Sequence, residues 1–158
     1  MKRILLILGI ALAFVACDKE NQEENLSSLL YDNSGYVKLS QDYVFFDKEK
    51  GGTITIEAEE DAYVDGISRQ VGTKLDSEVF YDITPPDYVV TLDQILEYEE
   101  FTTPGLKVIP NGFRKFTIIV EPNCGYDLYH VGIVKIVETK KYGKVGGRGG
   151  NSFKVVLQ

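Results

Sequence analysis

The sequence predicts an all-β fold, a sandwich or a barrel, from three observations. First, apolar and polar residues alternate along several short segments; in residues 53–59, positions 54, 56 and 58 are apolar and the others are threonine or glutamate. Second, glycine and proline turn signals separate these segments. Third, only one segment carries a helix-start signal. Alternation places the apolar side chains of a strand on one face, and many short strands at this spacing are typical of sandwiches and barrels.

The expected strands follow one another between recognisable turns. Residues 116–121 repeat the alternation with positions 116, 118 and 120 facing inward, and residues 131–137 are rich in β-branched side chains. Four phenylalanines alternate as strand-core residues do, and we expect most of them to be structural: Phe45, Phe46, Phe116 and Phe153. The expected strands are 37–39, 43–47, 53–59, 62–68, 78–83, 105–109, 116–121, 131–137 and 153–157. The separating turns include Gly51-Gly52, Asp65-Gly66, Pro85-Pro86 and Pro110-Asn111-Gly112.

One short helix interrupts this pattern. Thr91-Leu92-Asp93-Gln94 fits a capping box, in which the Thr91 hydroxyl and the Gln94 side chain satisfy each other's backbone N–H groups. Val90 and Ile95 are placed to form the flanking hydrophobic staple. The sequence therefore predicts a helix of two to three turns that ends before Pro104-Gly105.

The N-terminus has the layout of a secretory signal. Lys2 and Arg3 precede 13 consecutive apolar residues, 4–16. This run is too short to span a bilayer comfortably, since a spanning helix needs about 20 apolar residues. Cys17 follows at once. Residues 1–16 are therefore predicted to be a signal peptide.

The end of this segment resembles a lipobox, the cleavage motif of bacterial lipoproteins. Phe14-Val15-Ala16-Cys17 has the small residue expected before the cut, although Phe14 stands where the family usually has leucine. The resemblance implies cleavage before Cys17, lipidation of its thiol and an outer-membrane lipoprotein held to the membrane through lipid. Several acyl chains on one residue make a durable anchor. The alternative is an ordinary secretory signal followed by a coincidental cysteine.

A polar tether is expected after the anchor, over residues 17–35. Residues 17–25 hold four acids, one lysine and no large apolar side chain, so they cannot form a core and are predicted to be disordered. Acidic residues directly after the lipidated cysteine resemble the surface-export signal of Bacteroidetes-type lipoproteins. This likeness implies exposure at the cell surface, while the periplasmic face stays open.

Composition limits the remaining domain. Removing residues 1–16 from the 158 leaves 142 residues, enough for one domain, and changes the net charge from −7 to −9 because it removes two basic residues and no acids. An acidic surface repels phosphate backbones, so nucleic acid is not an expected partner. With Cys17 acylated, Cys124 has no partner in the chain, so no internal disulfide is expected.

Two blocks resemble the opening and the ending of a BACON domain. Residues 39–56 carry the leucine-serine start, the aromatic step at Phe45-Phe46, and Gly51-Gly52 before an alternating strand. The ending matches at 116–123, 131–136 and 153–158, whereas Gln41 replaces the usual proline and Tyr63 a frequent core tryptophan. The resemblance implies an immunoglobulin-like β-sandwich over residues 36–158, of a family common in Bacteroidetes surface proteins beside glycan-degrading enzymes. Residues of about 69–112 exceed the family pattern and are predicted to be an insertion.

Catalytic patterns are mostly missing, and an enzyme is not expected. The glycine-rich residues 142–151 have neither P-loop nor dinucleotide spacing, which favours a hairpin loop. One histidine, His130, and one free cysteine leave zinc without ligands, and there is no Gly-x-Ser-x-Gly motif for a triad. No cofactor or metal is predicted. Whether the acidic cluster Glu57, Glu59, Glu60 and Asp61 holds Ca²⁺ stays open, with a solvated hairpin tip favoured.

Sugar binding is the sharpest functional hypothesis. Tyrosine rings stack on apolar sugar faces, and the candidate platform residues are Tyr81, Tyr88, Tyr98, Tyr126 and Tyr129, each of which is also a plausible core residue. The first hypothesis is an accessory glycan-associated or adhesive surface lipoprotein. The alternative is a structural spacer or protein-interaction module without sugar affinity. Exposed, clustered tyrosines would favour the first, and an unprotected edge strand with an apolar patch would favour the second.

Overall fold

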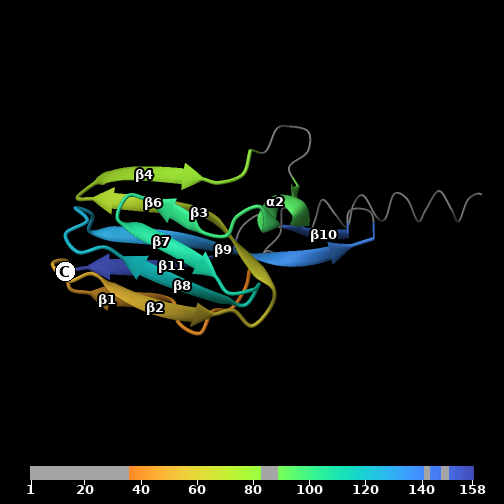
Figure 1. Cartoon of the computed structure of the whole chain (residues 1–158), viewed down its shortest axis with the longest axis horizontal. Coiled ribbons are helices and arrows are strands. Elements are labelled where there is room, and N and C mark those ends of the chain that lie inside the picture. Colours follow the sequence, from red (N-terminus) through yellow and green to blue (C-terminus); the bar gives the residue numbers. More distant parts are fainter. Residues whose placement is uncertain (1–35, 83–88, 141–142, 147–149) are drawn as a thin grey trace, which may run out of the picture.

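The computed structural model describes residues 36–82, 89–140, 143–146 and 150–158, and within them the chain forms two β-sheets packed face to face (Figure 1). The all-β sandwich predicted from the sequence is confirmed. The expected signal peptide, Cys17 and the tether of residues 17–35 lie outside the described residues. The two sheets position every side chain discussed below.

The larger sheet has seven strands among the described residues, and the smaller has four. The larger sheet contains β1 (Tyr43–Phe46), β3 (Ala62–Val71), β4 (Lys74–Val79), β5 (Val90–Thr91), β9 (Leu128–Thr139), β10 (Gly143–Gly146) and β11 (Asn151–Leu157). The smaller sheet contains β2 (Gly52–Glu57), β6 (Phe101–Thr103), β7 (Leu106–Pro110) and β8 (Lys115–Val120). Helix α2 (Leu92–Leu96) lies beside β10 in Figure 1.

Strand β9 organises the larger sheet. It pairs antiparallel with β3 on one side, and on the other side with β11 along its first half and with β10 along its second half. Strand β4 continues the sheet beyond β3, and β1 runs parallel to β11 at the opposite edge. The main order is therefore β4-β3-β9-β11-β1.

This order is that of an immunoglobulin-like sandwich. The strands β4-β3-β9-β11 occupy the C′, C, F and G positions of the immunoglobulin sheet, and β2-β8-β7 occupy the B, E and D positions of the other. Strand β6 widens the smaller sheet beyond β7. The turn-separated strands of the sequence thus pair in the arrangement that was expected.

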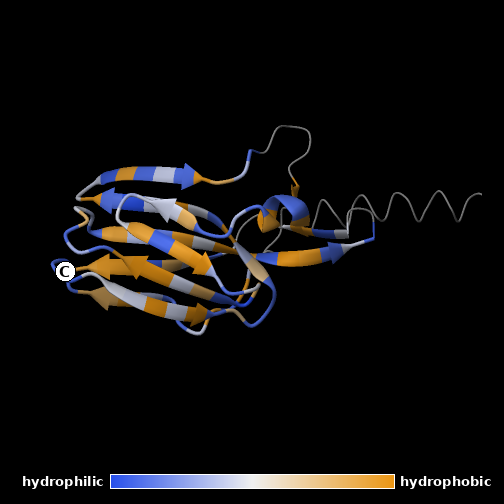
Figure 2. Cartoon of the chain, in the orientation of Figure 1, coloured by the Kyte–Doolittle hydropathy of each residue, from blue (hydrophilic) through white to orange (hydrophobic). Residues whose placement is uncertain are grey.

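The core lies between the two sheets and is formed by the alternating positions. Phe116 and Ile118 of β8 are paired with Ile56 and Ile54 of β2 within one sheet. Together with Val120 they belong to the same buried cluster as the inward side chains of β9 and β11. Val131, Ile133, Phe153 and Val155 have no exposed surface. Alternating bands of hydrophobic and hydrophilic residues run along the strands in Figure 2. Each fully buried branched or aromatic side chain stabilises the fold by about 1.5–3 kcal/mol relative to exposure.

Several local expectations need correction. The strand expected at 37–39 forms only an isolated bridge between Leu39 and Ala58, and the turn expected at Asp65-Gly66 is a bulge within β3. Phe45 is 55% exposed rather than part of the core, because β1 turns Val44 and Phe46 inward and so points Phe45 outward. The strand expected near 78–83 is instead β4, which begins at Lys74 and ends at Val79. The residues predicted to be an insertion, about 69–112, contain β4, β5, α2, β6 and β7.

The capping box of α2 is present as the sequence predicts. The Thr91 side chain accepts from the Gln94 N–H, and the Gln94 side chain accepts from the Thr91 N–H. The α-helical segment is only five residues long, shorter than two to three turns. Its C-cap is Glu97, and the next residue, Tyr98, stacks on Phe101 with the two ring centroids 5.1 Å apart.

The paired glycines close the turn between the sheets. Gly51 has φ of +64°, and a Cβ there would lie 2.3 Å from the Val120 carbonyl oxygen. Its N–H donates to the Asp47 carbonyl at 2.9 Å, so the chain crosses from β1 to β2 within a few residues. A side chain at this position would strain the backbone and also collide with β8.

We expect Gly51→Ala to lower the free energy of unfolding by about 2–4 kcal/mol, because it combines left-handed strain with overpacking. Gly72→Ala is the matched control, since Gly72 has φ of +55° but a methyl group added there would meet no atom within 4 Å. It should lose only about 1–2 kcal/mol. Urea denaturation of both variants measures the difference, and equal losses would contradict the proposed contact with Val120.

Candidate functional site

The five candidate tyrosines do not form an exposed platform. Tyr129 has no exposed surface and Tyr81 is 6% exposed, which corrects the expectation for both. The hydroxyl of Tyr129 donates to the Pro104 carbonyl at 2.9 Å, and that of Tyr81 donates to the Val64 carbonyl at 3.0 Å. Both rings therefore serve the core, with their polar ends satisfied by backbone. Tyr88 lies outside the described residues.

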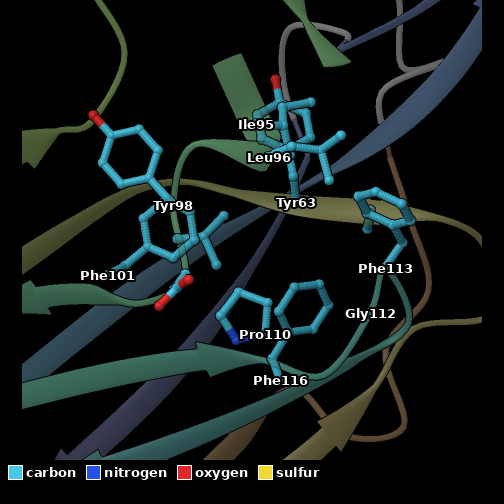
Figure 3. Close-up of a pocket in the computed structure, with 12 residues that line it drawn as sticks. Tyr63, Ile95, Leu96, Tyr98, Phe101, Pro110, Gly112, Phe113 and Phe116 are labelled. Atoms are coloured by element: carbon cyan, nitrogen blue, oxygen red, sulfur yellow. The ribbon is translucent and has the colours of Figure 1, made fainter. Parts of the chain in front are cut away.

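The other two tyrosines are half-buried, and each lines a cavity. Tyr98 borders a first cavity of about 230 Å³, which lies between α2 and the ends of the two sheets (Figure 3). Tyr126 borders a second cavity of about 370 Å³. Ala62, Tyr63, Val64, Ile95, Leu96, Tyr98, Glu99, Phe101, Pro110, Gly112, Phe113 and Phe116 line the first. Arg69, Val71, Lys74, Asp76, Cys124, Gly125 and Tyr126 line the second.

Aromatic packing holds the wall of the first cavity. Tyr98 and Phe101 are stacked with an interplanar angle of 12°, and Phe80 packs edge-on against Phe101 at 4.9 Å. The Tyr98 hydroxyl donates to the Phe80 carbonyl, which fixes the ring in this position. Phe116 and Tyr63 are buried in the core beneath the opening. These contacts preform the apolar surface of the cavity.

The opening of the first cavity is bordered by exposed side chains, unlike its buried interior. Leu96 is 58% exposed and Glu99 is exposed, so one apolar and one acidic side chain border the opening. Among the residues that the structure describes, no lysine or arginine lines the cavity. The carboxylate of Glu99 forms no ion pair with any described residue, whereas its neighbour Glu100 pairs with Lys107 at 3.2 Å. The cavity is therefore aromatic inside and negative at its mouth.

Arg69 dominates the second cavity. It takes an inward position of β3, where it is 7% exposed, and donates to Glu78 at 3.2 Å and also to Asp76. It donates in addition to Thr103 of β6, so it connects the two sheets. Asp76 raises the pKa of Arg69, and Arg69 holds the pKa of Asp76 below its ordinary value. The Nε atom is buried without a hydrogen-bond partner.

The ring of Tyr126 completes this cavity. The Arg69 guanidinium lies 5.8 Å from the ring centroid, a cation–π arrangement. Cys124 also lines this cavity, and its thiol hydrogen-bonds with the Tyr129 hydroxyl. Burial, together with this hydrogen bond, raises the pKa of Tyr129. The second cavity is therefore more polar than the first.

The acidic cluster at residues 57–61 is neutralised by cations. Each carboxylate has its own partner, and the pairs are Glu57–Lys115 at 3.1 Å, Glu59–Lys38 at 2.9 Å, Glu60–Lys135 at 2.8 Å and Asp61–Arg114 at 2.9 Å. Within the described ranges, no group of three or more histidine, cysteine or acidic side chains is arranged to hold a metal ion. The carboxylates instead link strand ends that are distant in the sequence.

The outward surface of β4-β3-β9-β11-β1, called here the outer face, is poor in charge. The register aligns Phe45, Val156, Leu128, Gln70 and Leu75 in one row across the five strands. The adjacent outward positions are Tyr43, Lys154, His130, Ser68, Ser77, Ser152, Gly132, Gly66 and Val79. Lys154 is the one acidic or basic residue among these positions, apart from His130.

Large apolar side chains stand at both edges of the outer face. Tyr43 and Phe45 of β1 are 57% and 55% exposed and pack edge-on at 5.3 Å. At the other edge, Leu75 and Val79 of β4 are 62% and 68% exposed. Burial and Lys154 lower the pKa of His130, which favours the neutral imidazole on this surface at neutral pH. Of the described strands, β4 pairs only with β3, so its other edge is unpaired.

His130 does not build a catalytic constellation. Its Nδ1 lies 3.1 Å from the Ser152 hydroxyl, but no carboxylate among the described residues orients the ring. Neither residue lines either cavity. A serine nucleophile needs a base oriented by a third group and donors for the oxyanion. The pair stands on a sheet surface as a cross-strand hydrogen bond.

The comparisons add little to this geometry. No known family model matches the chain, and no curated protein matches it. Among solved structures it is similar to a chain in "Structural basis of T cell specificity and activation by the bacterial superantigen toxic shock syndrome toxin-1". The identity is 10%, the match covers 78% of this chain and 99% of that one, and the TM-score is 0.36, too low to carry a functional argument. Among the described residues, no helix is long and apolar enough to cross a membrane.

Several site residues were not expected from the sequence. Arg69 occupies an inward strand position two residues after Ile67, so its place in the apolar alternation could have indicated a buried arginine. Phe113 lies directly after the turn Pro110-Asn111-Gly112, and this position is a weaker indication of a site residue. The sequence pattern does not distinguish Glu99 from its neighbours Glu97 and Glu100.

A half-buried carboxylate in β3 provides a test of the electrostatics. Asp65 occupies the bulge of β3 between Val64 and Gly66, and burial raises the pKa of its carboxyl. A folded-state pKa above the unfolded value means that charged Asp65 destabilises the fold above the folded pKa. That destabilisation disappears as the pH falls below the unfolded value of about 3.9.

We expect Asp65→Asn to raise the melting temperature at pH 7, with the gain shrinking toward zero near pH 3.5. Asp76→Asn is the control of opposite sign, since the pKa of Asp76 is lowered by Arg69 and its charge stabilises the fold at pH 7. Thermal unfolding across this pH range measures both. A melting temperature for Asp65→Asn that stays below the parent at pH 7 would contradict the burial of this carboxylate.

Proposed function

We propose that this chain is a lipid-anchored, non-catalytic binding protein of the cell envelope that docks a protein partner on its outer face. The observation that carries the proposal is the row of Phe45, Val156, Leu128, Gln70 and Leu75 across five strands, which is apolar except at Gln70. Exposed Tyr43 and Phe45 bound it at one edge, and exposed Leu75 and Val79 at the other. Of the two functional hypotheses drawn from the sequence, this geometry favours the protein-interaction module.

Charge distribution supports a protein partner. Lys, Arg, Asp and Glu make up 26% of the sequence, but Lys154 alone represents them among the aligned outward positions named above, with Asp65 in the β3 bulge beside Gly132. The cores of protein–protein interfaces are depleted in charge and enriched in aromatic residues. The row from Phe45 to Leu75 crosses five strands, or roughly 19 Å at the usual strand spacing. Its width suits one side of a standard interface, about 800 Å² for each partner.

The proposed anchor places this surface at the envelope. The lipobox-like Phe14-Val15-Ala16-Cys17 and the preceding apolar run support lipidation of Cys17 and an outer-membrane location. Residues 17–35 would then separate the anchor from the domain by at most about 70 Å of extended chain. The acids after Cys17 support display at the cell surface. The BACON-like blocks fall on β1, β2, β8, β9 and β11, which supports kinship with that family of sandwiches.

Site-specific photo-crosslinking tests the docking proposal. With benzoylphenylalanine at position 45 or 75 in the full chain in cells, we expect adducts to the same envelope protein, because both positions belong to one face. Thr53, exposed on the smaller sheet, is the matched control and should give no such adduct. Val79→Asp should reduce the adduct from position 45 at least fivefold, because a buried unpaired charge destabilises the complex.

Equal adduct yields from positions 45 and 53 would contradict docking on the outer face. An adduct of twice the chain mass would instead identify a second copy as the partner.

Glycan binding is the second candidate function, and the second cavity favours it. Tyr126 offers a half-buried ring beside the polar groups of Arg69, Lys74 and Asp76, the combination by which sugars are bound. However, Arg69 and Asp76 already form an ion pair with each other, so fewer of their polar atoms can bind sugar hydroxyls. Only one of the candidate tyrosines lines this cavity, whereas a pair was expected, since Tyr129 is buried. Both observations favour the protein partner.

A glycan array probed with the chain from residue 18 onward separates the two candidates. The glycan proposal predicts reproducible binding that falls at least tenfold in Tyr126→Ala, because stacking of the sugar on this ring is lost, and that is retained in the exposed control Tyr43→Ala. Binding that Tyr43→Ala abolishes and Tyr126→Ala preserves would contradict a sugar site in the second cavity.

A further inference from the structure

Aromatic rings make up five of the twelve described residues that line the first cavity: Tyr63, Tyr98, Phe101, Phe113 and Phe116. Tyr98 and Phe113 are half-buried, whereas Tyr63, Phe101 and Phe116 are at most 2% exposed and form the buried layer beneath them. Figure 3 shows the rings of Tyr98, Phe101, Phe113 and Phe116 set around the opening. Aromatic faces carry negative electrostatic potential and attract cations, and aromatic surroundings are the usual means of binding quaternary ammonium groups.

The charge at the mouth reinforces this preference. Glu99 borders the cavity and forms no ion pair with a described residue, and none of the described lining residues is basic. This contrasts with the acids of residues 57–61, each of which has its own cation. An unpaired carboxylate beside an aromatic cavity complements a ligand that is positive and apolar at once.

Few polar side chains line the cavity, which argues against a sugar or another highly hydroxylated ligand. The Tyr98 hydroxyl is occupied by the Phe80 carbonyl, and most other lining side chains are apolar. Hydroxyl groups buried here would lose their hydrogen bonds to water without replacement. A trimethylammonium group makes no such demand, because its charge is surrounded by methyl groups.

The size of the cavity also fits such a group. An apolar cavity of roughly 150 Å³ holds benzene, and a trimethylammonium group is of similar bulk. The 230 Å³ here leaves additional space for the short chain of a choline-like molecule at the open side, next to Leu96 and Glu99. The stacked and edge-on rings of Tyr98, Phe101 and Phe80 mean that this wall needs little rearrangement on binding.

We propose that the first cavity binds a small quaternary ammonium cation of the choline type, with the half-buried rings of Tyr98 and Phe113 against its methyl groups and Glu99 beside its charge. The site lies at the α2 end of the sandwich and is separate from the outer face, so it does not depend on the docking function proposed above. The ligand is a free cation rather than a phosphocholine headgroup, because the phosphate would face Glu99 and a chain of net charge −7.

The experiment compares choline with its neutral isostere 3,3-dimethylbutan-1-ol by NMR titration of the chain from residue 18 onward, which retains every described residue. We expect choline to bind at least tenfold more tightly, with shifts at Tyr98, Phe101 and Phe113, because only choline gains from the rings and the carboxylate. Phosphocholine should bind more weakly than choline. Titration with sodium chloride at equal ionic strength corrects for salt.

Two exposed glutamates provide matched variants. Glu99→Gln should weaken choline binding about fivefold or more and leave the binding of the neutral isostere unchanged, whereas Glu97→Gln, outside the lining, should alter neither. Both substitutions are on the surface, so folding is retained. The proposal is overturned if the isostere binds as well as choline, if choline shifts no lining residue, if Glu99→Gln binds choline as the parent does, or if phosphocholine binds more tightly.

Discussion

The pairing of β9 with three other strands is the constraint on which the rest of the structure depends. Its residues 128–135 bond to β3, and its other edge bonds first to β11 and then to β10. Tyr129, Val131 and Ile133 point into the core with no exposed surface. Leu128, His130 and Gly132 alternate with them on the outer face. A one-residue slip would exchange these sets, so the register that closes the core also creates the docking surface.

The elaborations on the sandwich have a different role from its strands. The segment of α2, Tyr98 and β6 turns a sheet end into the first cavity, by placing a short capped helix and a stacked ring pair beside the loop before β8. At the other end, Arg69 stands where an apolar residue would continue the core and connects β3 to β6 through Thr103. Stability thus resides in the strands, while both cavities depend on side chains near the sandwich ends.

Patterns that act locally were predictable from the sequence. The alternation in β2 and β8, the capping box of α2 and the turn at Gly51 each depend on residues within a few positions of one another. The two-sheet arrangement followed because many short alternating strands have few ways to bury one face.

Features set by distant partners were not predictable. Apolar residues occupy 44, 45 and 46 in succession, so alternation could not choose the outward one; the parallel pairing with β11 turns Phe45 out. Tyr81 and Tyr129 became core residues because backbone carbonyls of Val64 and Pro104 accept their hydroxyls. The cations that neutralise residues 57–61 come from Lys38, Arg114, Lys115 and Lys135. Tertiary contacts decided each case.

Native-state hydrogen exchange tests the central place of β9 most directly. If β9 holds the sandwich together, its amides between Val131 and Val134 exchange only through global unfolding and are the slowest in the domain. The amides of β4 that bond to β3 should exchange at least about a hundredfold faster, because an edge strand with exposed side chains opens locally. Equal protection of β4 and β9, or faster exchange in β9, would contradict the account.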